Sequence, residues 1–305
     1  IIHLHKLFRN WPDLPLDTVI VDECQDCREW MVKEVRDHSR RQLWLGDNKQ
    51  QIYSQAEEDD CISDFEDDPD IFDDEQMFLD TNFRNSLFIA HLAASFLETD
   101  EDRFNFINPV RNNTRQISDA NNFPSVFIEC DDEGDENEVV ENIIKNIRAR
   151  DEATRRIAIV RYKHNDLDET GYYLESVNIN ITRLPKDTRT KDQEIPYMDL
   201  KDKDLTLLST IHSLKGLEVD YLIFVGSDRV NFHEDSSESI KNNLMHVLFS
   251  RAKKRVFMTL FDKSECIVCN RLGNGFENQD YYQYITSDDF LDSGDSSSNS
   301  EEDLD

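Results

Sequence analysis

The sequence predicts an α/β protein built on parallel β-sheets, and two patterns support this fold class. Short apolar runs bounded by polar residues recur along the 305 residues, as expected for strands that are buried on both faces. Between these runs, segments such as 88–97 and 139–147 repeat apolar residues at the helical period. Alternating strands and helices indicate parallel layers, and the length allows two domains. The predicted strands span residues 18–23, 42–47, 125–130, 156–162, 179–184, 205–211, 221–226 and 255–260.

The chain is strongly acidic, with 65 acidic against 34 basic residues and a net charge of −31. This balance argues against a generic nucleic-acid-coating surface, so any polyanion must be bound locally. We expect an acidic solvated loop at 57–76, a polar connector at 185–204 and a disordered acidic tail at 291–305. Two interpretations of the charge stay open: adaptation to high internal salt, or regulation through these segments.

No run is as long as a membrane span, and the first residues lack the order of a secretory signal. We therefore expect an intracellular protein of the cytoplasm or nucleus, with no membrane partner. Six cysteines include two CxxC pairs, Cys24/Cys27 and Cys266/Cys269. The spacing allows zinc half-sites, but free thiols in a reducing compartment are the better interpretation.

Two predicted strands of the N-terminal part end in polar residues that suit phosphate chemistry. Asp22 and Glu23 follow the first apolar run, where one carboxylate could hold a metal ion and the next could orient a water. A solvated strand end or a helix cap is the alternative. In LGDNKQQIY, Gln50 could donate to a phosphate oxygen and accept from a water. A tight turn into a helix explains that stretch equally well.

Two arginines stand in segments that could contact a nucleotide. In FLDTNFRNS, Phe83 offers an aromatic face for a base and Arg84 a forked donor for phosphate oxygens. Helix capping is the alternative there. Arg251 lies where a predicted helix leads into a strand, from which it could stabilise charge on a phosphoryl group. Surface charge is the alternative for this arginine.

The stretch STIHSLKGLE (209–218) combines polar side chains with a glycine in one strand-to-helix turn. Gly216 permits a close backbone approach to a phosphate chain, and Glu218 could accept a hydrogen bond from a ribose hydroxyl. Taken alone, His212 would more often be structural.

Together and in this order, VDECQD, LGDNKQQIY, LDTNFRN, STIHSLKGLE and LFSRAKKR resemble motifs II to VI of superfamily-1 helicases of the UvrD/Rep/PcrA type. The resemblance spans residues 18 to about 260. It implies two RecA-like parallel-sheet domains, the first one only partial. It also implies ATP and Mg²⁺ as cofactors, single-stranded DNA as the partner with RNA not excluded, and 3′-to-5′ movement.

The resemblance assigns roles in the N-terminal part to four residues. Asp22 would hold the magnesium ion, and Glu23 would activate the attacking water. Gln25 and Gln50 would sense the γ-phosphate and couple it to the nucleic-acid surface.

Other roles fall in the second domain. Phe83, at a position that the family usually gives to Tyr, would stack on adenine, and Arg84 would contact the γ-phosphate. Gly216 and Glu218 would lie at the nucleotide, with Glu218 on the ribose, and Arg251 would be a second phosphate-clamping arginine.

Two further residues of this domain, Thr210 and His212, would lie near the nucleic acid.

The chain departs from the family pattern in three places. The phosphate-binding loop GxxxxGKS/T is absent, so this chain by itself is not expected to hydrolyse ATP. Truncation is the favoured explanation and a degenerate remnant the other. The acidic residues after Tyr53 replace a segment that grips single-stranded DNA, and between Arg84 and Thr210 there is no room for a large inserted subdomain.

The leading hypothesis is therefore a fragment of an ATP-dependent 3′-5′ DNA helicase or translocase. The alternative is a degenerate, non-catalytic module that binds basic proteins through its acidic loops. The expected domains are 1–80, 81–290 and the tail 291–305, and the oligomeric state stays open.

Overall fold

The computed structural model describes residues 16–52, 82, 84–112, 123–150, 156–184, 205–232, 236–273 and 281–295. The chain forms two compact units. The first unit comprises 1–79 with 234–244, and the second comprises 80–233 with 245–305.

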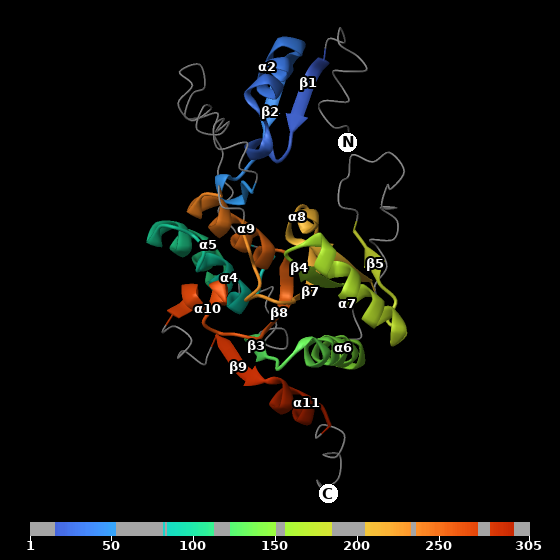
Figure 1. Cartoon of the computed structure of the whole chain (residues 1–305). Coiled ribbons are helices and arrows are strands. Elements are labelled where there is room, and N and C mark those ends of the chain that lie inside the picture. The colour runs from blue at the N-terminus through green and yellow to red at the C-terminus, as the bar shows by residue number, and fades with distance from the viewer. Residues whose placement is uncertain are drawn as a thin grey trace, which may run out of the picture. The chain divides into compact units, whose positions relative to one another are not determined.

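The first unit is a strand-helix-strand element. Strand β1 (Leu16–Val21) leads through helix α2 (Glu29–His38) to strand β2 (Ser39–Trp44). The two strands pair in parallel over their whole length (Figure 1). A helix is the usual way to cross between parallel strands, because the chain must return to the same edge before the second strand starts.

One face of this small sheet is buried and the other is open. The buried core consists of Val19, Val21, Cys24, Cys27 and Val35. Ile20 and Leu43, which are opposite each other in the register, are 63% and 50% exposed. The prediction that these runs are buried on both faces is therefore wrong for the first unit. The alternation of inward and outward residues is that of a sheet covered on one side.

The second unit contains a seven-stranded sheet in the order β5-β6-β4-β7-β8-β3-β9, and every pair in it is parallel. Its central strands are apolar on both faces, as predicted. The strands are β3 (Ser125–Glu129), β4 (Ile157–Arg161), β5 (Thr182–Arg183), β6 (Thr206–Thr210), β7 (Val219–Phe224), β8 (Ala252–Leu260) and β9 (Tyr282–Thr286).

Helices cover both faces of this sheet (Figure 1). One layer holds α6 (Glu133–Arg150), α7 (His164–Ser176) and α11 (Ser287–Asp295). The other holds α4 (Leu87–Ala94), α5 (Asp100–Asn112), the later part of α9 (Glu238–Ser250) and α10 (Ile267–Leu272). The short helix α8 (Ile211–Leu214) follows β6. In this second layer, the His246 ring of α9 contacts the carbonyl oxygen of Ala93 at 3.0 Å.

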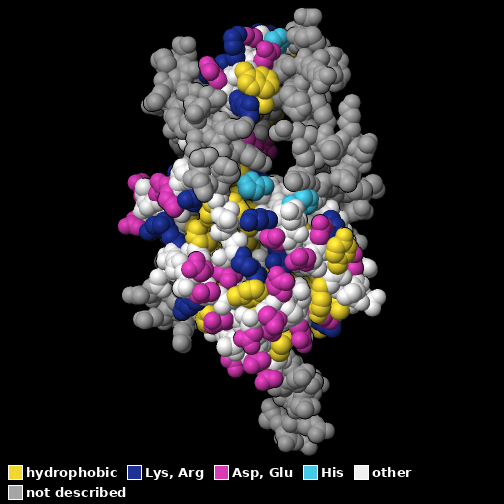
Figure 2. All heavy atoms as spheres, viewed as in Figure 1, with side chains coloured by type: hydrophobic (Ala, Val, Ile, Leu, Met, Phe, Trp, Pro, Cys, Tyr) yellow, Lys and Arg dark blue, Asp and Glu magenta, His cyan; other side chains and the backbone are white. Residues whose placement is uncertain are grey.

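A buried carboxylate joins several elements of the second unit. Glu136 of α6 is fully buried and accepts hydrogen bonds from Arg161 (3.1 Å), from Arg229 (2.6 Å) and from the Thr259 hydroxyl (2.6 Å). Arg229 also stacks on the Phe261 ring, with its guanidinium carbon 3.7 Å from the ring centroid. Figure 2 shows acidic side chains spread over the face of this unit turned to the viewer, with basic and apolar side chains among them. Among the described residues, Glu136 and Asp220 are the acids classed as buried, and Glu136 is a structural acid because its charge is paired and hydrogen-bonded there.

Three sequence predictions differ from the observed elements. The strand predicted at 179–184 is reduced to Thr182–Arg183, and strand β9 was not predicted. Helix α11 continues to Asp295, so helical structure extends beyond 291, where the disordered tail was predicted to begin. The segments 57–76, 185–204 and 296–305 lie outside the described residues.

The described cysteines, which are all except Cys61, are free and buried, in agreement with the reduced-thiol interpretation. Burial, followed by electrostatic interactions with Cys24 and Asp26, raises the pKa of Cys27 to about 12. Within the described ranges, no group of three or more His, Cys, Asp or Glu residues is arranged to hold a metal ion. No helix in those ranges is long and apolar enough to cross a membrane.

Candidate nucleotide and nucleic-acid sites

The acid pair of the first unit lies directly after β1, as the sequence predicts. The Asp22 carboxylate accepts a hydrogen bond from the backbone N–H of Glu23 at 3.0 Å. Glu23 has a left-handed backbone conformation, with φ 56° and ψ 44°. Because a side chain with a Cβ adopts this conformation only at a cost, such outliers are concentrated at functional positions.

Gln25 connects the ends of the two strands. Its amide nitrogen donates to the Glu23 carboxylate at 2.6 Å, and its amide oxygen accepts from the backbone N–H of Asp47 at 3.1 Å. Gln25 is buried, with 2% of its surface exposed. A buried amide that makes both bonds orients the Glu23 carboxylate and links it to the turn after β2.

Gln50 belongs to the same group. Asp47 caps the short helix at Asn48–Gln50 by accepting from the backbone N–H of Lys49 at 2.9 Å, and the Gln50 amide donates to its second oxygen at 2.9 Å. The structure therefore brings Glu23, Gln25 and Gln50 into one hydrogen-bonded series through Asp47.

The donor set of the first unit fits a magnesium ion of the kind that binds through few protein ligands. Asp22 is exposed, and among the described residues its only hydrogen bond is the one from Glu23 N–H. Mg²⁺ usually binds through one or two carboxylates and takes its other ligands from water and substrate phosphates. Asp22 can supply such an oxygen.

The second unit has a charged cluster where β7 and β8 begin. The Arg84 guanidinium donates to the Glu218 carboxylate at 2.7 Å, across 134 positions of sequence. Lys253 contacts the other oxygen of Glu218 at 2.6 Å. Burial raises the pKa of Glu218, but the hydrogen bond from Lys253 and the charges of Arg84 and Lys253 outweigh it, so the net pKa is lowered. Glu218 is therefore ionised at neutral pH.

Sequence reasoning missed Lys253, and the sheet explains its position. Val219 pairs with Ala252, but Tyr221 pairs with Arg255, so β8 has one extra residue at this point. A bulge of this kind changes the direction in which a side chain points. The run of basic residues after Arg251 was a visible signal, but the irregularity that directs Lys253 toward Glu218 was not.

Arg251 occupies the single-residue turn between α9 and β8. It is 3% exposed, its Nε donates to the Val247 carbonyl at 3.3 Å, and its own carbonyl accepts from the Val219 N–H at 3.0 Å. The turn thus lies beside Glu218, which precedes Val219. Phe83 lies outside the described residues.

Thr210 and His212 lie at the opposite ends of the strands from Glu218. Thr210 ends β6 and pairs with Arg161, the last residue of β4, whereas Glu218 directly precedes the first residue of β7. Thr210 caps α8 by accepting from the Ser213 N–H at 3.3 Å. Glu218 and Thr210 are therefore at opposite ends of the parallel strands of this sheet.

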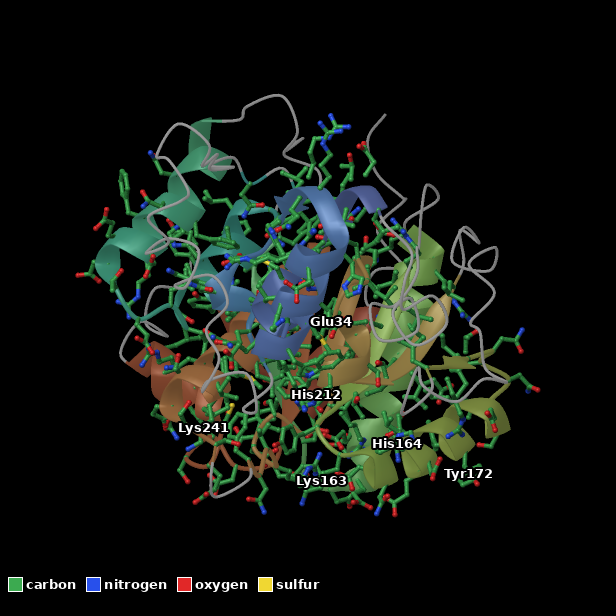
Figure 3. The ribbon with its side chains drawn as sticks, turned by 90° about the horizontal axis from the view of Figure 1, so that it is seen from above. Glu34, Lys163, His164, Tyr172, His212 and Lys241 are labelled. Carbon is green, nitrogen blue, oxygen red and sulfur yellow. The ribbon has the colours of Figure 1, made fainter. Side chains whose placement is uncertain are left out.

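The His212 side chain keeps contact with solvent at this carboxyl edge, although neighbouring protein atoms displace part of the water around its ring. Figure 3 labels it together with Lys163 and His164, which follow the neighbouring strand β4. Desolvation, and then the positive charge of Lys215, lower the pKa of His212. The imidazole is therefore neutral at pH 7.

Gly216 has φ 81°, a backbone conformation that residues with a Cβ rarely adopt. No atom lies within 4 Å of where its Cβ would be, so the backbone conformation explains the glycine, and a lack of space does not.

Comparisons with known proteins bear on the fold. No protein-family model and no curated protein matches the chain. A solved structure of S. cerevisiae Dbp5 L327V, bound to RNA and ADP BeF3, matches with a TM-score of 0.52 and 11% identity, over 96% of this chain and 65% of that one.

Two shorter structures also match. The C-terminal domain of a possible DNA helicase from Lactobacillus plantarum WCFS1 gives a TM-score of 0.43 at 16% identity, over 67% of this chain and 99% of that one. The C-terminal domain of the DEAD-box protein Dbp5 gives 0.40 at 13% identity, over 58% and 97%. These two scores are too low to add to the assignment. Together with the parallel sheet, the longer Dbp5 match identifies the fold as the α/β, RecA-like architecture of helicase domains.

Proposed function

We propose that this chain carries the nucleotide-sensing and strand-tracking elements of an ATP-dependent 3′-5′ DNA helicase or translocase of the UvrD/Rep/PcrA type. One observation carries the proposal. Arg84 and Glu218, which the motif resemblance assigns to one nucleotide from distant motifs, are in contact at 2.7 Å. An arginine and a carboxylate at a sheet edge suit a ligand that has both phosphate and hydroxyl groups.

In the first unit, Asp22 would hold Mg²⁺, whose charge neutralises phosphate oxygens during transfer. Glu23 would accept a proton from the attacking water, and its carboxylate is already oriented by the Gln25 amide at 2.6 Å. Gln50 would bind the γ-phosphate. Its amide also donates to the Asp47 carboxylate, so a movement of Gln50 on binding would reach the turn after β2.

In the second unit, Arg84 and Arg251 would contact the phosphates, and Glu218 would accept from the ribose. A bound phosphate would compete with Glu218 for the Arg84 guanidinium, and Lys253 would then keep Glu218 ionised. Phe83 would stack on adenine, and Gly216 would let the backbone approach the ligand.

At the opposite edge of the sheet, Thr210 and His212 would contact the strand. A neutral imidazole and a hydroxyl can hydrogen-bond to a phosphate or a base without adding charge to this acidic protein. DNA is the proposed track because of the motif resemblance. The Dbp5 structure was bound to RNA, which makes RNA the alternative for the same edge.

Nucleotide binding is tested with the 305-residue chain and a fluorescent ATP analogue. We expect Arg84→Gln and Glu218→Gln to weaken binding about tenfold each, since each removes a charge-assisted contact. Arg103→Gln is the matched control, because Arg103 is similarly exposed and also pairs with an acid, Asp100. Equal loss in the control would mean that general charge, not this cluster, governs binding.

Nucleic-acid binding is tested with fluorescent single-stranded DNA and RNA of the same sequence. We expect Thr210→Val and His212→Ala to weaken binding while the affinity for the ATP analogue stays the same, because they lie on another edge. Tighter binding of RNA than of DNA would overturn the choice of track. A chain that binds polylysine but neither nucleic acid nor nucleotide would support the non-catalytic module instead.

Hydrolysis is tested in a protein that joins this chain to a segment with a GxxxxGKS/T loop. Glu23→Gln should abolish DNA-stimulated ATP hydrolysis and leave ATP binding intact, because the amide cannot accept the proton. Full turnover in this variant would remove the role of Glu23. Displacement of streptavidin from only the 5′ end of a biotinylated strand would support 3′-to-5′ movement.

A further inference from the structure

Asn85, next to Arg84, is a buried amide with an unusual pair of partners. It is 5% exposed, and its Nδ2 donates to the carbonyl oxygens of Ser250 at 2.9 Å and Ala252 at 2.7 Å. An asparagine side chain has two N–H donors, and both are used here. The two carbonyls belong to the residues on either side of Arg251.

The amide orientation is determined by its neighbours. Asn85 Oδ1 accepts from the Asn82 amide at 3.1 Å, while both groups that face Nδ2 are carbonyl oxygens, which cannot donate. A flipped amide would place oxygen against oxygen at both carbonyls.

The segment that carries Arg84 is held just as closely. The Asn82 side-chain oxygen accepts from the backbone N–H groups of Arg84 and Asn85, both at 3.2 Å. Ser86 then caps α4 by accepting from the Ile89 N–H at 3.4 Å. The backbone of Arg84 is therefore fixed on both sides.

The turn that carries Arg251 is held from a second direction by β7. The Val219 N–H donates to the Arg251 carbonyl at 3.0 Å, and Val219 follows Glu218. Asn85 and Val219 thus connect three segments at positions adjacent to Arg84, Arg251 and Glu218. Without Asn85, the last carbonyl of α9 and the first carbonyl of β8 would lose this donor, and the turn between them could move relative to Arg84.

We infer that Asn85 is a positioning residue that sets the backbone of Arg251 relative to that of Arg84, so that the two arginines act on one polyphosphate as a pair. The inference rests on the proposed function for its ligand, but the placement itself rests on the hydrogen bonds alone. A merely structural role as a cap of α9 would change stability without changing which phosphates are recognised.

The first experiment compares affinities for ATP and AMP in the 305-residue chain. Asn85→Ala should weaken ATP binding about tenfold and AMP binding by less than about twofold, because AMP lacks the phosphates that the arginine pair would contact. Asn85→Ser, which keeps one donor, should fall between wild type and Asn85→Ala. An equal loss for both nucleotides in folded protein would overturn the inference.

Two control variants separate positioning from general loss of a hydrogen bond. Ser227→Ala removes a buried hydroxyl that donates to the Thr259 carbonyl at 3.0 Å, beyond the carboxyl end of β7. Asn142→Ala removes an exposed amide that donates to the Glu138 carbonyl at 2.9 Å. Neither should change the ratio of ATP to AMP affinity, and a change in either would count against a specific role of Asn85.

The second experiment needs no nucleotide. Nuclear magnetic resonance signals of the arginine Nε–H groups report on the local setting of Arg84 and Arg251. In Asn85→Ala, both signals should shift and the Arg84 Nε–H should exchange faster with water, because its bond to Glu218 loosens. Unchanged signals in folded Asn85→Ala would overturn the placement. If the signals shift as expected but wild type does not distinguish ATP from AMP, the proposed function fails and the placement stands.

Discussion

At the scale of single residues, Glu218 shows how the charged cluster responds to pH. Its pKa is lowered, because the hydrogen bond from Lys253 and the charges of Arg84 and Lys253 outweigh its burial. The ionised form is thus favoured in the folded state. Its contribution to stability is present above the ordinary pKa of 4.5 and is lost as the pH falls through the lower folded value.

The corresponding prediction compares wild type with Glu218→Gln by urea unfolding between about pH 7 and about pH 3. At neutral pH the variant should be less stable by less than about 1 kcal/mol, since the pair is partly exposed. The difference should disappear in acid. A difference that persists unchanged in acid would show that the glutamate acts through packing.

Glu136 is the opposite case, a carboxylate with no exposed surface that has three donors. Glu136→Gln should destabilise the second unit by about 3 kcal/mol, because Arg161 would keep its charge in a buried site without its partner. Glu138→Gln, on an exposed position of the same helix, is the control and should change stability by less than about 0.5 kcal/mol. Equal effects in urea unfolding would contradict a buried ionic centre.

At the scale of elements, the turns after β6 and β7 contain two glycines of different kinds. Both have positive φ, 81° at Gly216 and 71° at Gly226. A Cβ at Gly216 would meet nothing within 4 Å, whereas at Gly226 it would lie 2.5 Å from the Arg229 guanidinium. That same guanidinium nitrogen donates to Glu136.

Gly216→Ala should therefore cost only the backbone strain, about 1 kcal/mol. Gly226→Ala should cost at least about 1 kcal/mol more, because Arg229 must also leave Glu136. Thermal and urea unfolding of the two variants give the comparison. Equal losses would mean that Arg229 can move without cost.

The elements also show the limits of apolar patterning. Runs such as 157–161 and 221–224 were predicted correctly as strands, because apolar β-branched residues reflect burial between two helical layers. Tyr282–Thr286 carries no such run and forms a strand because β3 supplies its hydrogen bonds. In the first unit, Ile20 has the same local pattern as a buried residue but faces outward.

At the scale of the whole molecule, the two units differ in how much core they bury. Among the described residues, the first unit has a core cluster of five buried residues, and the second has one of seventeen. The small sheet of the first unit also exposes Ile20 and Leu43. Fewer buried contacts mean a lower free energy for local opening.

We therefore expect the backbone amides of β1 and β2 to exchange with deuterium faster than those of β4 and β7. Hydrogen exchange followed by mass spectrometry measures this difference on peptides from each unit. Ile20→Thr, on the open face, should leave the protection of β4 unchanged. Equal protection in both units would show that they open as one cooperative body.

Local sequence was sufficient for the fold class and for most strands and helices of the second unit. The spacing of apolar residues and the turn-forming residues can both be recognised within a short segment of the chain. The order of the motifs also identified Arg84, Glu218 and Arg251 as candidates. Their contacts, and the roles of Asn85, Lys253 and Glu136, depended on tertiary structure. The hydrogen-bonded pairs among them are separated by up to 167 positions, and the strand order and the bulge in β8 bring them together. Periodicity encodes which face of an element is buried, but not which distant element covers it.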